Sequence, residues 1–237
     1  MQSIPQFFEH YAAQHADRPY IWEKQNGTYF STSYADFREQ VHIFAAGLKE
    51  VGIQQEERVA LLSEGRNDWI MSELGVLYNG AVCVPLSTKL SDAELVFRLE
   101  HAACNTVIVS GQQFPKLSRI APRLQAMSRV ILLDSDVAEG SKYVQKQVVI
   151  DKGKLYLQQN REAFDTIWQN VSPETYANIS YTSGTTADPK GIVLTHNNYT
   201  ANARQGCALM EIPKHFIMFI VLPWDHSFAQ IPQAFTA

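Results

Sequence analysis

Short apolar segments alternate with amphipathic segments through the first half of the chain, and this alternation constrains the fold more than any other feature. The apolar segments are Val59–Leu62, Ala81–Val84, Thr106–Val109 and Val130–Leu133. The stretches between them carry apolar residues at helical spacing. Strands separated by helices require right-handed crossovers, which produce a largely parallel sheet with helices on both faces. The sequence therefore predicts an α/β fold.

The helices of this pattern have recognisable starts. The pair Ser33 and Asp36 and the pair Ser91 and Glu94 each predict a helix that begins in the manner of a capping box. A serine at the N-cap accepts a hydrogen bond from a backbone N–H that the helix itself cannot satisfy. Two more helices are predicted at Asp68–Tyr78 and Lys116–Ala126.

Two places predict short antiparallel hairpins in addition to the parallel sheet. The first surrounds Asn26-Gly27, a favoured two-residue turn between Ile21–Lys24 and Tyr29–Ser31. The second surrounds residues 151–154, which lie between Val148–Ile150 and Leu155–Leu157. We interpret both hairpins as edge strands or as a small separate sheet.

The chain divides at a weakly patterned segment, from about Glu139 to Pro173, which we interpret as a connector. We predict a first α/β lobe over residues 1–172 and the beginning of a second lobe over residues 173–237. Phe216–Leu222 predicts a fully buried strand, and the apolar segment from Ser227 stops without a capping residue or a polar tail. A buried strand needs neighbours for its backbone groups. We therefore expect the chain to be the incomplete front portion of a longer protein.

Charge and cysteine usage exclude several classes of protein. The chain has 20 basic and 24 acidic side chains, a formal net charge of −4, and no clustered cationic face of the kind that binds nucleic acid. Its 3 cysteines show no CxxC pair and no metal-ligand spacing, which indicates free thiols in a reducing compartment. The N-terminus lacks a signal-peptide pattern, and the longest apolar run is too short to cross a bilayer. We expect a cytoplasmic protein; peripheral contact with the inner membrane face stays open.

The stretch Tyr181–His196 reads YTSGTTADPKGIVLTH, a loop rich in hydroxyl groups with a single lysine. Glycine lets the backbone approach an anion closely, and the hydroxyls are adjustable hydrogen-bond donors. Hydrogen bonds to a charged group each contribute about 1.5–3 kcal/mol. Several such bonds together with Lys190 would hold a polyphosphate. The common alternative for a tract of this composition is a flexible surface turn.

A nucleotide-binding P-loop, G-x-x-x-x-G-K-[ST], is a second alternative. Counted from Gly184, the lysine falls in the right place at Lys190. However, Pro189 replaces the second glycine, and Gly191 replaces the residue whose hydroxyl would bind magnesium. A proline also removes a backbone N–H that the phosphate would use. The sequence therefore disfavours a Walker-type P-loop.

The whole string Y-T-S-G-T-T-x-x-P-K-G, followed by V-L-T-H, resembles the signature phosphate loop of the adenylate-forming superfamily, which includes acyl-CoA synthetases, luciferases and peptide-synthetase adenylation domains. The resemblance implies that the loop holds the β- and γ-phosphates of ATP while a carboxylate attacks the α-phosphate. Ala187 departs from the family's usual glycine, and in a left-handed backbone alanine would cost about 1 kcal/mol. The implied ATP-phosphate site consists of Thr182, Ser183, Gly184, Thr185, Thr186 and Lys190.

A second string, VLPWDHSFAQ, is similar to the family's L-P-x-x-H motif beside the acyl and adenylate pocket. The resemblance makes His226 a candidate catalytic residue, with Trp224 and Phe228 as apolar walls. On the residues alone, the favoured interpretation of His226 is a helix-start histidine hydrogen-bonded to backbone. The front half, at Arg66–Trp69 and Gly80–Leu86, resembles the long-chain fatty acyl-CoA synthetase branch and carries no assigned chemistry.

Taken together, the resemblance implies the N-terminal part of an ATP-dependent long-chain fatty acid–CoA ligase. Its substrates would be a fatty acid, ATP and coenzyme A, with Mg²⁺ bound through residues outside this chain. Lys190 would stabilise the departing pyrophosphate. The adenine site, the magnesium-binding glutamate, the hinge and the mobile C-terminal domain would all lie in a missing C-terminal portion, so we expect this chain alone to be inactive. The alternative is a non-catalytic nucleotide-binding or interaction module derived from that family.

Overall fold

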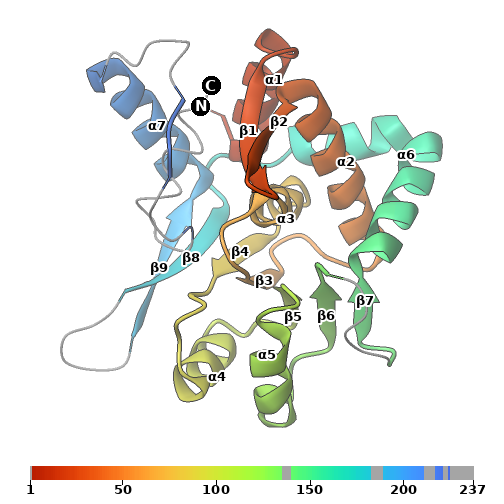
Figure 1. The fold of residues 1–237 in the computed structure, drawn as a ribbon, viewed down its shortest axis with the longest axis vertical. Helices are drawn as coiled ribbons and strands as arrows, with labels where there is room; N and C mark the ends of the chain where they lie inside the picture. The colour runs from red at the N-terminus through yellow and green to blue at the C-terminus, as the bar shows by residue number, and fades with distance from the viewer. Residues whose placement is uncertain (1, 135–139, 183–188, 211–216, 221–223, 225–237) are drawn as a thin grey trace.

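A seven-stranded sheet forms the centre of the computed structural model, which describes residues 2–134, 140–182, 189–210, 217–220 and 224. The strand order is β7-β6-β5-β3-β4-β8-β9. Neighbouring strands run parallel except for β9, which runs antiparallel to β8 (Figure 1). This confirms the predicted α/β class. The strands are β3 Arg58–Leu62, β4 Val82–Pro85, β5 Thr106–Val109, β6 Arg129–Leu132, β7 Tyr143–Gln145, β8 Tyr176–Thr182 and β9 Lys190–Thr195.

Helices cover both faces of this sheet. The side chains of β3 show the division: Val59 and Leu61 belong to one buried cluster with α1, α2, α3 and α6, while Ala60 and Leu62 belong to another with α4 and α5. Successive side chains of a strand point to opposite faces, so a strand buried on both faces reads as a continuous apolar run. The helices are α1 Ile4–Gln14, α2 Tyr34–Glu50, α3 Asn67–Tyr78, α4 Asp92–His101, α5 Phe114–Ile120, η1 Ala121–Arg123, α6 Lys146–Gln169 and α7 His196–Met210.

The predicted helix starts are confirmed. The Ser33 hydroxyl accepts the Asp36 N–H at 3.1 Å at the start of α2, and Ser91 forms a complete capping box with Glu94 at the start of α4. The structure adds a helix that the sequence analysis did not predict, α1, which begins with a capping box between Ser3 and Gln6.

The first predicted hairpin is also confirmed. β1 (Pro19–Gln25) and β2 (Thr28–Ser33) pair antiparallel and form a separate two-stranded sheet. Asn26 and Gly27 have φ angles of 49° and 87°. Positive φ at both central residues is what a type I′ turn requires, which explains why Asn-Gly is found there.

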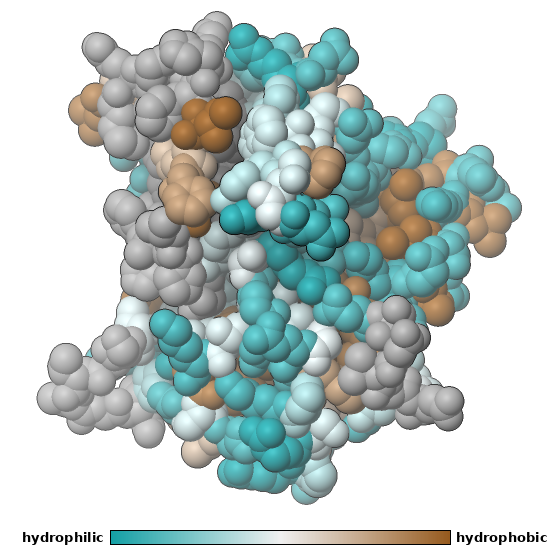
Figure 2. All heavy atoms as spheres, viewed as in Figure 1, coloured by the Kyte–Doolittle hydropathy of each residue, from teal (hydrophilic) through white to brown (hydrophobic). Residues whose placement is uncertain are grey.

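The second predicted hairpin is wrong, and so is the connector from Glu139 to Pro173. Residues 146–169 form α6, which packs along α2. Val149, Leu157 and Phe164 are buried, whereas Val148 and Leu155 are 44% and 57% exposed. These exposed residues produced the misleading strand pattern, and apolar side chains gather over α6 on the surface (Figure 2). The sequence pattern placed Gly153 in a turn. In the structure it lies in α6, where the absence of a side chain lets this helix contact the backbone of α2.

The predicted buried strand Phe216–Leu222 is not found in its described part. Residues 217–220 form no strand, and Ile217 and Phe219 are 67% and 74% exposed. An apolar segment becomes a stable strand only where neighbouring strands pair with it. The residues from Ser227 onward lie outside the described residues.

The predicted boundary between residues 172 and 173 stays a prediction. β8 pairs parallel with β4 through Asn178 and Cys83, so residues on both sides of the boundary contribute to one sheet. Within the described residues, no helix is both long enough and apolar enough to cross a bilayer.

Candidate phosphate-binding site

The two ends of the hydroxyl-rich loop meet as paired residues of the β8–β9 hairpin. Thr182 is the last residue of β8, Lys190 is the first of β9, and the two are directly opposite in the antiparallel register. Opposed residues of an antiparallel pair project on the same face with Cβ atoms about 4.5–5.5 Å apart. Both residues are exposed. The register therefore places the side chains of Thr182 and Lys190 next to each other on one face at the base of the loop.

The rest of the predicted site lies outside the described residues. Ser183, Gly184, Thr185 and Thr186 are in the segment between the two strands, as is the departing residue Ala187. His226, with its neighbours Asp225 and Phe228, is likewise outside the described part of the chain. Their assignment stays a prediction.

Tyr181, next to Thr182, anchors the hairpin to α4. Its hydroxyl donates to the Arg98 carbonyl at 3.3 Å and lies 2.8 Å from Nδ1 of His101. The Arg98 guanidinium lies over the Tyr181 ring, 5.3 Å from its centroid. Burial raises the pKa of Tyr181 to about 12, so the phenol stays protonated and keeps its hydrogen bonds. This anchor was not predicted from the sequence.

The lysine is followed by glycine for a steric reason. Gly191 is opposite Tyr181 in the register. A Cβ at Gly191 would lie 3.1 Å from a methyl carbon of Ile179 and 3.4 Å from the Tyr181 ring. The first distance is tighter than most packed contacts, so a side chain at position 191 would require Ile179 to shift by a few tenths of an ångström, whereas the second is ordinary contact.

The T-H pair that ends the motif forms a joint between β9 and α7. Thr195 and Asn198 exchange hydrogen bonds in which the Thr195 N–H donates to Oδ1 of Asn198 and the Asn198 N–H donates to the Thr195 hydroxyl. His196 is buried, and its Nδ1 accepts the N–H of Ile4 at 3.3 Å. Burial lowers the pKa of His196 to about 4. These residues hold the helix after the loop against the N-terminal helix.

Trp224, which was predicted as an apolar wall of the substrate pocket, packs near the carboxyl end of β3. Its indole is edge-on to Trp69 with ring centroids 5.9 Å apart. A Cβ at Gly65 would lie 3.0 Å from that indole. Ligands of open α/β sheets bind outside the carboxyl ends of the strands. The position fits the predicted role, which stays a prediction.

Ion pairs connect charged side chains near the carboxyl ends of the strands. Arg66 contacts Asp134 at 2.8 Å and Asp68 at 2.5 Å, and Lys146 contacts Asp68 at 2.8 Å. Burial raises the pKa of Asp134, but hydrogen bonds from Arg66 and the Gly111 N–H outweigh burial and lower it. Among the described residues there is no group of three or more His, Cys, Asp and Glu side chains that could hold a metal ion. We assign this network a structural role.

Comparison with protein families identifies the class. The family model described as "AMP-binding enzyme" matches residues 8–237, so this chain belongs to the AMP-binding enzyme family. Among curated relatives, Long chain acyl-CoA synthetase 8 of Arabidopsis thaliana is 28% identical over 209 residues. That alignment covers 85% of this chain and 28% of the relative. Long-chain-fatty-acid–CoA ligase ACSBG2 of Xenopus laevis is 24% identical over 243 residues, 97% of this chain and 31% of the relative.

Solved structures share the fold. A long-chain-fatty-acid-CoA ligase, FadD1, from Archaeoglobus fulgidus superposes with a TM-score of 0.82 at 20% identity and covers 98% of this chain and 44% of that one. The N-terminal domain of FACL13 from Mycobacterium tuberculosis gives a TM-score of 0.77 at 21% identity over 100% of this chain and 55% of that one. The chain thus spans about a third of the length of the curated relatives named above.

Proposed function

We propose that this chain carries the ATP-phosphate site of an acid–CoA ligase that forms an acyl-adenylate. The observation that supports this most directly is the register of the β8–β9 hairpin, which places Thr182 opposite Lys190 at the mouth of the loop. A hydroxyl donor and a cation on one face can bind the same phosphate oxygen from two sides. In this proposal Ser183, Gly184, Thr185 and Thr186 complete the cradle between them.

The reaction would proceed in two steps. A fatty acid carboxylate attacks the α-phosphorus of ATP, which forms acyl-AMP and releases pyrophosphate. The thiolate of coenzyme A then attacks the acyl carbonyl, which forms the thioester and releases AMP. The names of the curated relatives support a long-chain fatty acid as the substrate.

The chain's own residues would overcome charge repulsion in the first step. A carboxylate and a triphosphate are both anions, so their approach needs positioning and neutralisation. Lys190 and the loop hydroxyls would hold the β- and γ-phosphates and stabilise the charge that develops on pyrophosphate. His226 would line the acyl-adenylate pocket. Magnesium, when bound, would neutralise further phosphate charge through ligands beyond the described residues.

Calorimetry with ATP and with tripolyphosphate tests the site in this chain. We expect Lys190→Met to weaken the binding of both anions by about tenfold or more, since it removes a charge-assisted hydrogen bond. Lys152→Met is the matched control, because Lys152 is exposed on α6. In a full-length protein that contains this chain, Lys190→Met should also slow pyrophosphate release. Equal anion binding by the two variants would remove the basis of the proposal.

The second candidate function is a non-catalytic nucleotide-binding or interaction module. The presence of Ala187 at a usual glycine position favours it. The two candidates differ in a full-length protein. A ligase releases pyrophosphate only when an acid substrate is present, whereas a non-catalytic module binds ATP and releases no pyrophosphate.

A further inference from the structure

His101, the last residue of α4, packs against Tyr181 near the end of β8. Its Nδ1 lies 2.8 Å from the Tyr181 hydroxyl, and the two rings meet edge to face with centroids 5.7 Å apart. The imidazole also stacks on Phe97, with centroids 5.4 Å apart and an angle of 20° between the ring planes. Although His101 is exposed to solvent, its ring therefore contacts two aromatic rings.

Tyr181 lies at the base of the candidate phosphate loop. It directly precedes Thr182 in β8, and across the hairpin it is opposite Gly191, the residue that follows Lys190. The contacts that hold Tyr181 in place therefore also determine where the two strands present Thr182 and Lys190.

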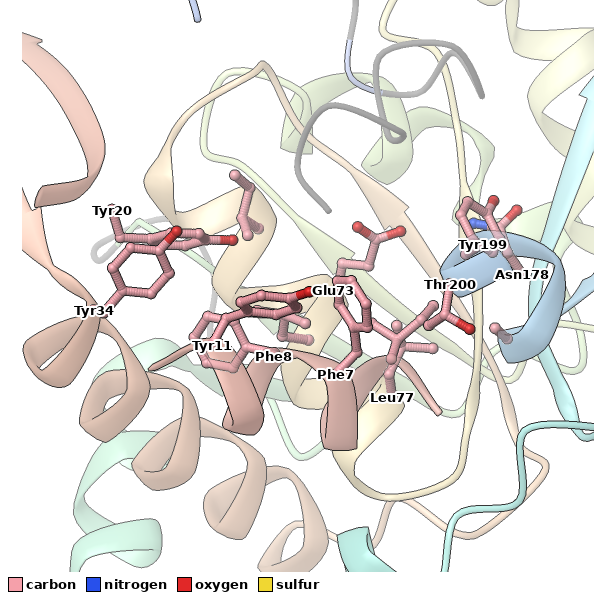
Figure 3. Close-up of a pocket in the computed structure, with 14 residues that line it drawn as sticks. Phe7, Phe8, Tyr11, Tyr20, Tyr34, Glu73, Leu77, Asn178, Tyr199 and Thr200 are labelled. Atoms are coloured by element: carbon pink, nitrogen blue, oxygen red, sulfur yellow. The ribbon is translucent and has the colours of Figure 1, made fainter. Parts of the chain in front are cut away.

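The two faces of β8 are supported differently. Successive side chains of a strand point to opposite faces. Ile179 and Tyr181 pack against the buried cluster that contains α4. Asn178 instead lines a cavity of about 60 Å³ between α1, α3, β8 and α7 (Figure 3). Groups that line a void lose packing contacts on that side. The contact with α4 is therefore an important support of this strand.

The hydrogens at this contact can be assigned from the donors and acceptors. The Tyr181 hydroxyl has one hydrogen, which it donates to the Arg98 carbonyl at 3.3 Å. A hydroxyl oxygen can accept a second hydrogen bond while it donates. Both contacts of Tyr181 are hydrogen bonds only if Nδ1 of His101 carries a hydrogen and donates it to the tyrosine oxygen. With the hydrogen on Nε2 instead, Tyr181 would donate to either the ring nitrogen or the carbonyl, and one bond would be lost.

We propose that His101 is a positioning residue for the candidate phosphate loop. Its Nδ1–H donates to the Tyr181 hydroxyl and leaves the tyrosine hydrogen available to the Arg98 carbonyl, which fixes the residue next to Thr182. The assignment of the hydrogens depends on the geometry alone, whereas its consequence for anion binding rests on the proposed function.

Proton–nitrogen NMR correlation spectra of the histidine rings at pH 9 test the assignment of the hydrogens. Tyr181 keeps its hydrogen at this pH, because burial raises its pKa to about 12. Comparison with His101→Phe identifies the His101 signals among those of the 7 histidines. We expect the ring hydrogen of His101 on Nδ1. A hydrogen on Nε2 would overturn the proposal whatever the anion affinity.

Calorimetry with tripolyphosphate tests the positioning role in this chain. His101→Phe keeps an aromatic ring but has no donor, and it should weaken binding by about fivefold. His101→Asn places an amide N–H near the position of Nδ1 and should bind within about twofold of the original chain. In a Tyr181→Phe background, His101→Phe should cause no further loss, because the hydroxyl that it contacts is already absent. His10→Phe, at an exposed histidine of α1, is the control and should bind like the original chain.

The outcomes separate this inference from the proposed function. If Lys190→Met weakens tripolyphosphate binding and His101→Phe does not, the positioning role is wrong and the proposed function stands. A further loss from His101→Phe when Tyr181 is already phenylalanine would also overturn the positioning role. If the original chain binds no tripolyphosphate, both the proposed function and the positioning role are wrong.

Discussion

Gly153 of α6 lies against the backbone carbonyl of Ile43 in α2, so close that a Cβ at position 153 would be 1.8 Å from that oxygen. Gly47 of α2 makes the reciprocal approach, since its Cβ would be 1.9 Å from the carbonyl oxygen of Val149. The two helix backbones are therefore in direct contact. No side chain can be accommodated at either glycine unless the helices move apart.

Gly153→Ala should strongly destabilise the protein. Alanine favours an isolated helix over glycine by about 1 kcal/mol, so local propensity predicts stabilisation. The clash with the Ile43 carbonyl reverses the sign, and we expect a loss of about 3 kcal/mol or more in the free energy of unfolding. Denaturant unfolding measures it. Lys154→Ala, at an exposed position of the same helix, is the control and should change little.

Glu9→Gln should destabilise the contact among the N-terminal helices. The Glu9 carboxylate accepts hydrogen bonds from the Tyr78 hydroxyl at 2.6 Å, from Nε of Arg38 at 2.6 Å, and from His42. An amide can accept fewer of these bonds and carries no charge. We expect a loss of about 2–4 kcal/mol at pH 7 in chemical denaturation.

The pH dependence of the same variant gives a second check. Burial raises the pKa of Glu9, but the interactions with His42, Tyr78 and Arg38 outweigh burial and lower it. The ionised Glu9 carboxylate therefore stabilises the folded state fully above its unfolded-state pKa. This contribution to the free energy of unfolding is lost as the pH falls through the folded-state pKa. The difference between Glu9→Gln and the original chain should shrink at acid pH. Glu39→Gln, at an exposed residue of α2, should show neither effect.

His196→Asn should flatten the pH dependence of stability between pH 6.5 and about 4. The pKa of His196 is lowered by burial to about 4, so in this window the unfolded state binds a proton that the folded state does not. Stability in the original chain should fall by roughly 3 kcal/mol as the pH drops through the window. Asparagine can still accept the Ile4 N–H without titrating. An unchanged slope in thermal unfolding at several pH values would contradict this; His10→Asn, at an exposed residue, is the control.

Tyr181→Phe should loosen the base of the candidate phosphate loop. The substitution keeps the ring beneath the Arg98 guanidinium but removes the hydroxyl that contacts His101 and the Arg98 carbonyl. We expect about 1 kcal/mol of lost stability and weaker tripolyphosphate binding, measured by calorimetry. Tyr176→Phe serves as the comparison because Tyr176 is 61% exposed on the same strand. Similar anion affinity in the two variants would show that this anchor does not position the loop.

The sequence predicts which residues of the candidate site would bind an anion, but it does not predict the contacts that hold those residues in place. The run of hydroxyl residues and Lys190 predicts an anion-binding loop, because residue types and their order along the chain are enough to name the candidate donors; this stays a prediction. The anchor of Tyr181 on α4 was not predictable, since Arg98 and Tyr181 are 83 residues apart.

The sequence by itself determined β3, β4, β5 and β6 of the parallel sheet, the Asn26-Gly27 hairpin and the starts of α2 and α4. Each depends on residues within a few positions of one another, so a local pattern is sufficient. Only the tertiary structure decided that residues 146–169 are helical, with a kink at Asn160. There the apolar pattern supported both a hairpin and a helix, and the packing of Gly153 and Val149 against α2 favours the helix. Contacts between residues far apart in sequence leave no local pattern, and they decide wherever local preference is balanced.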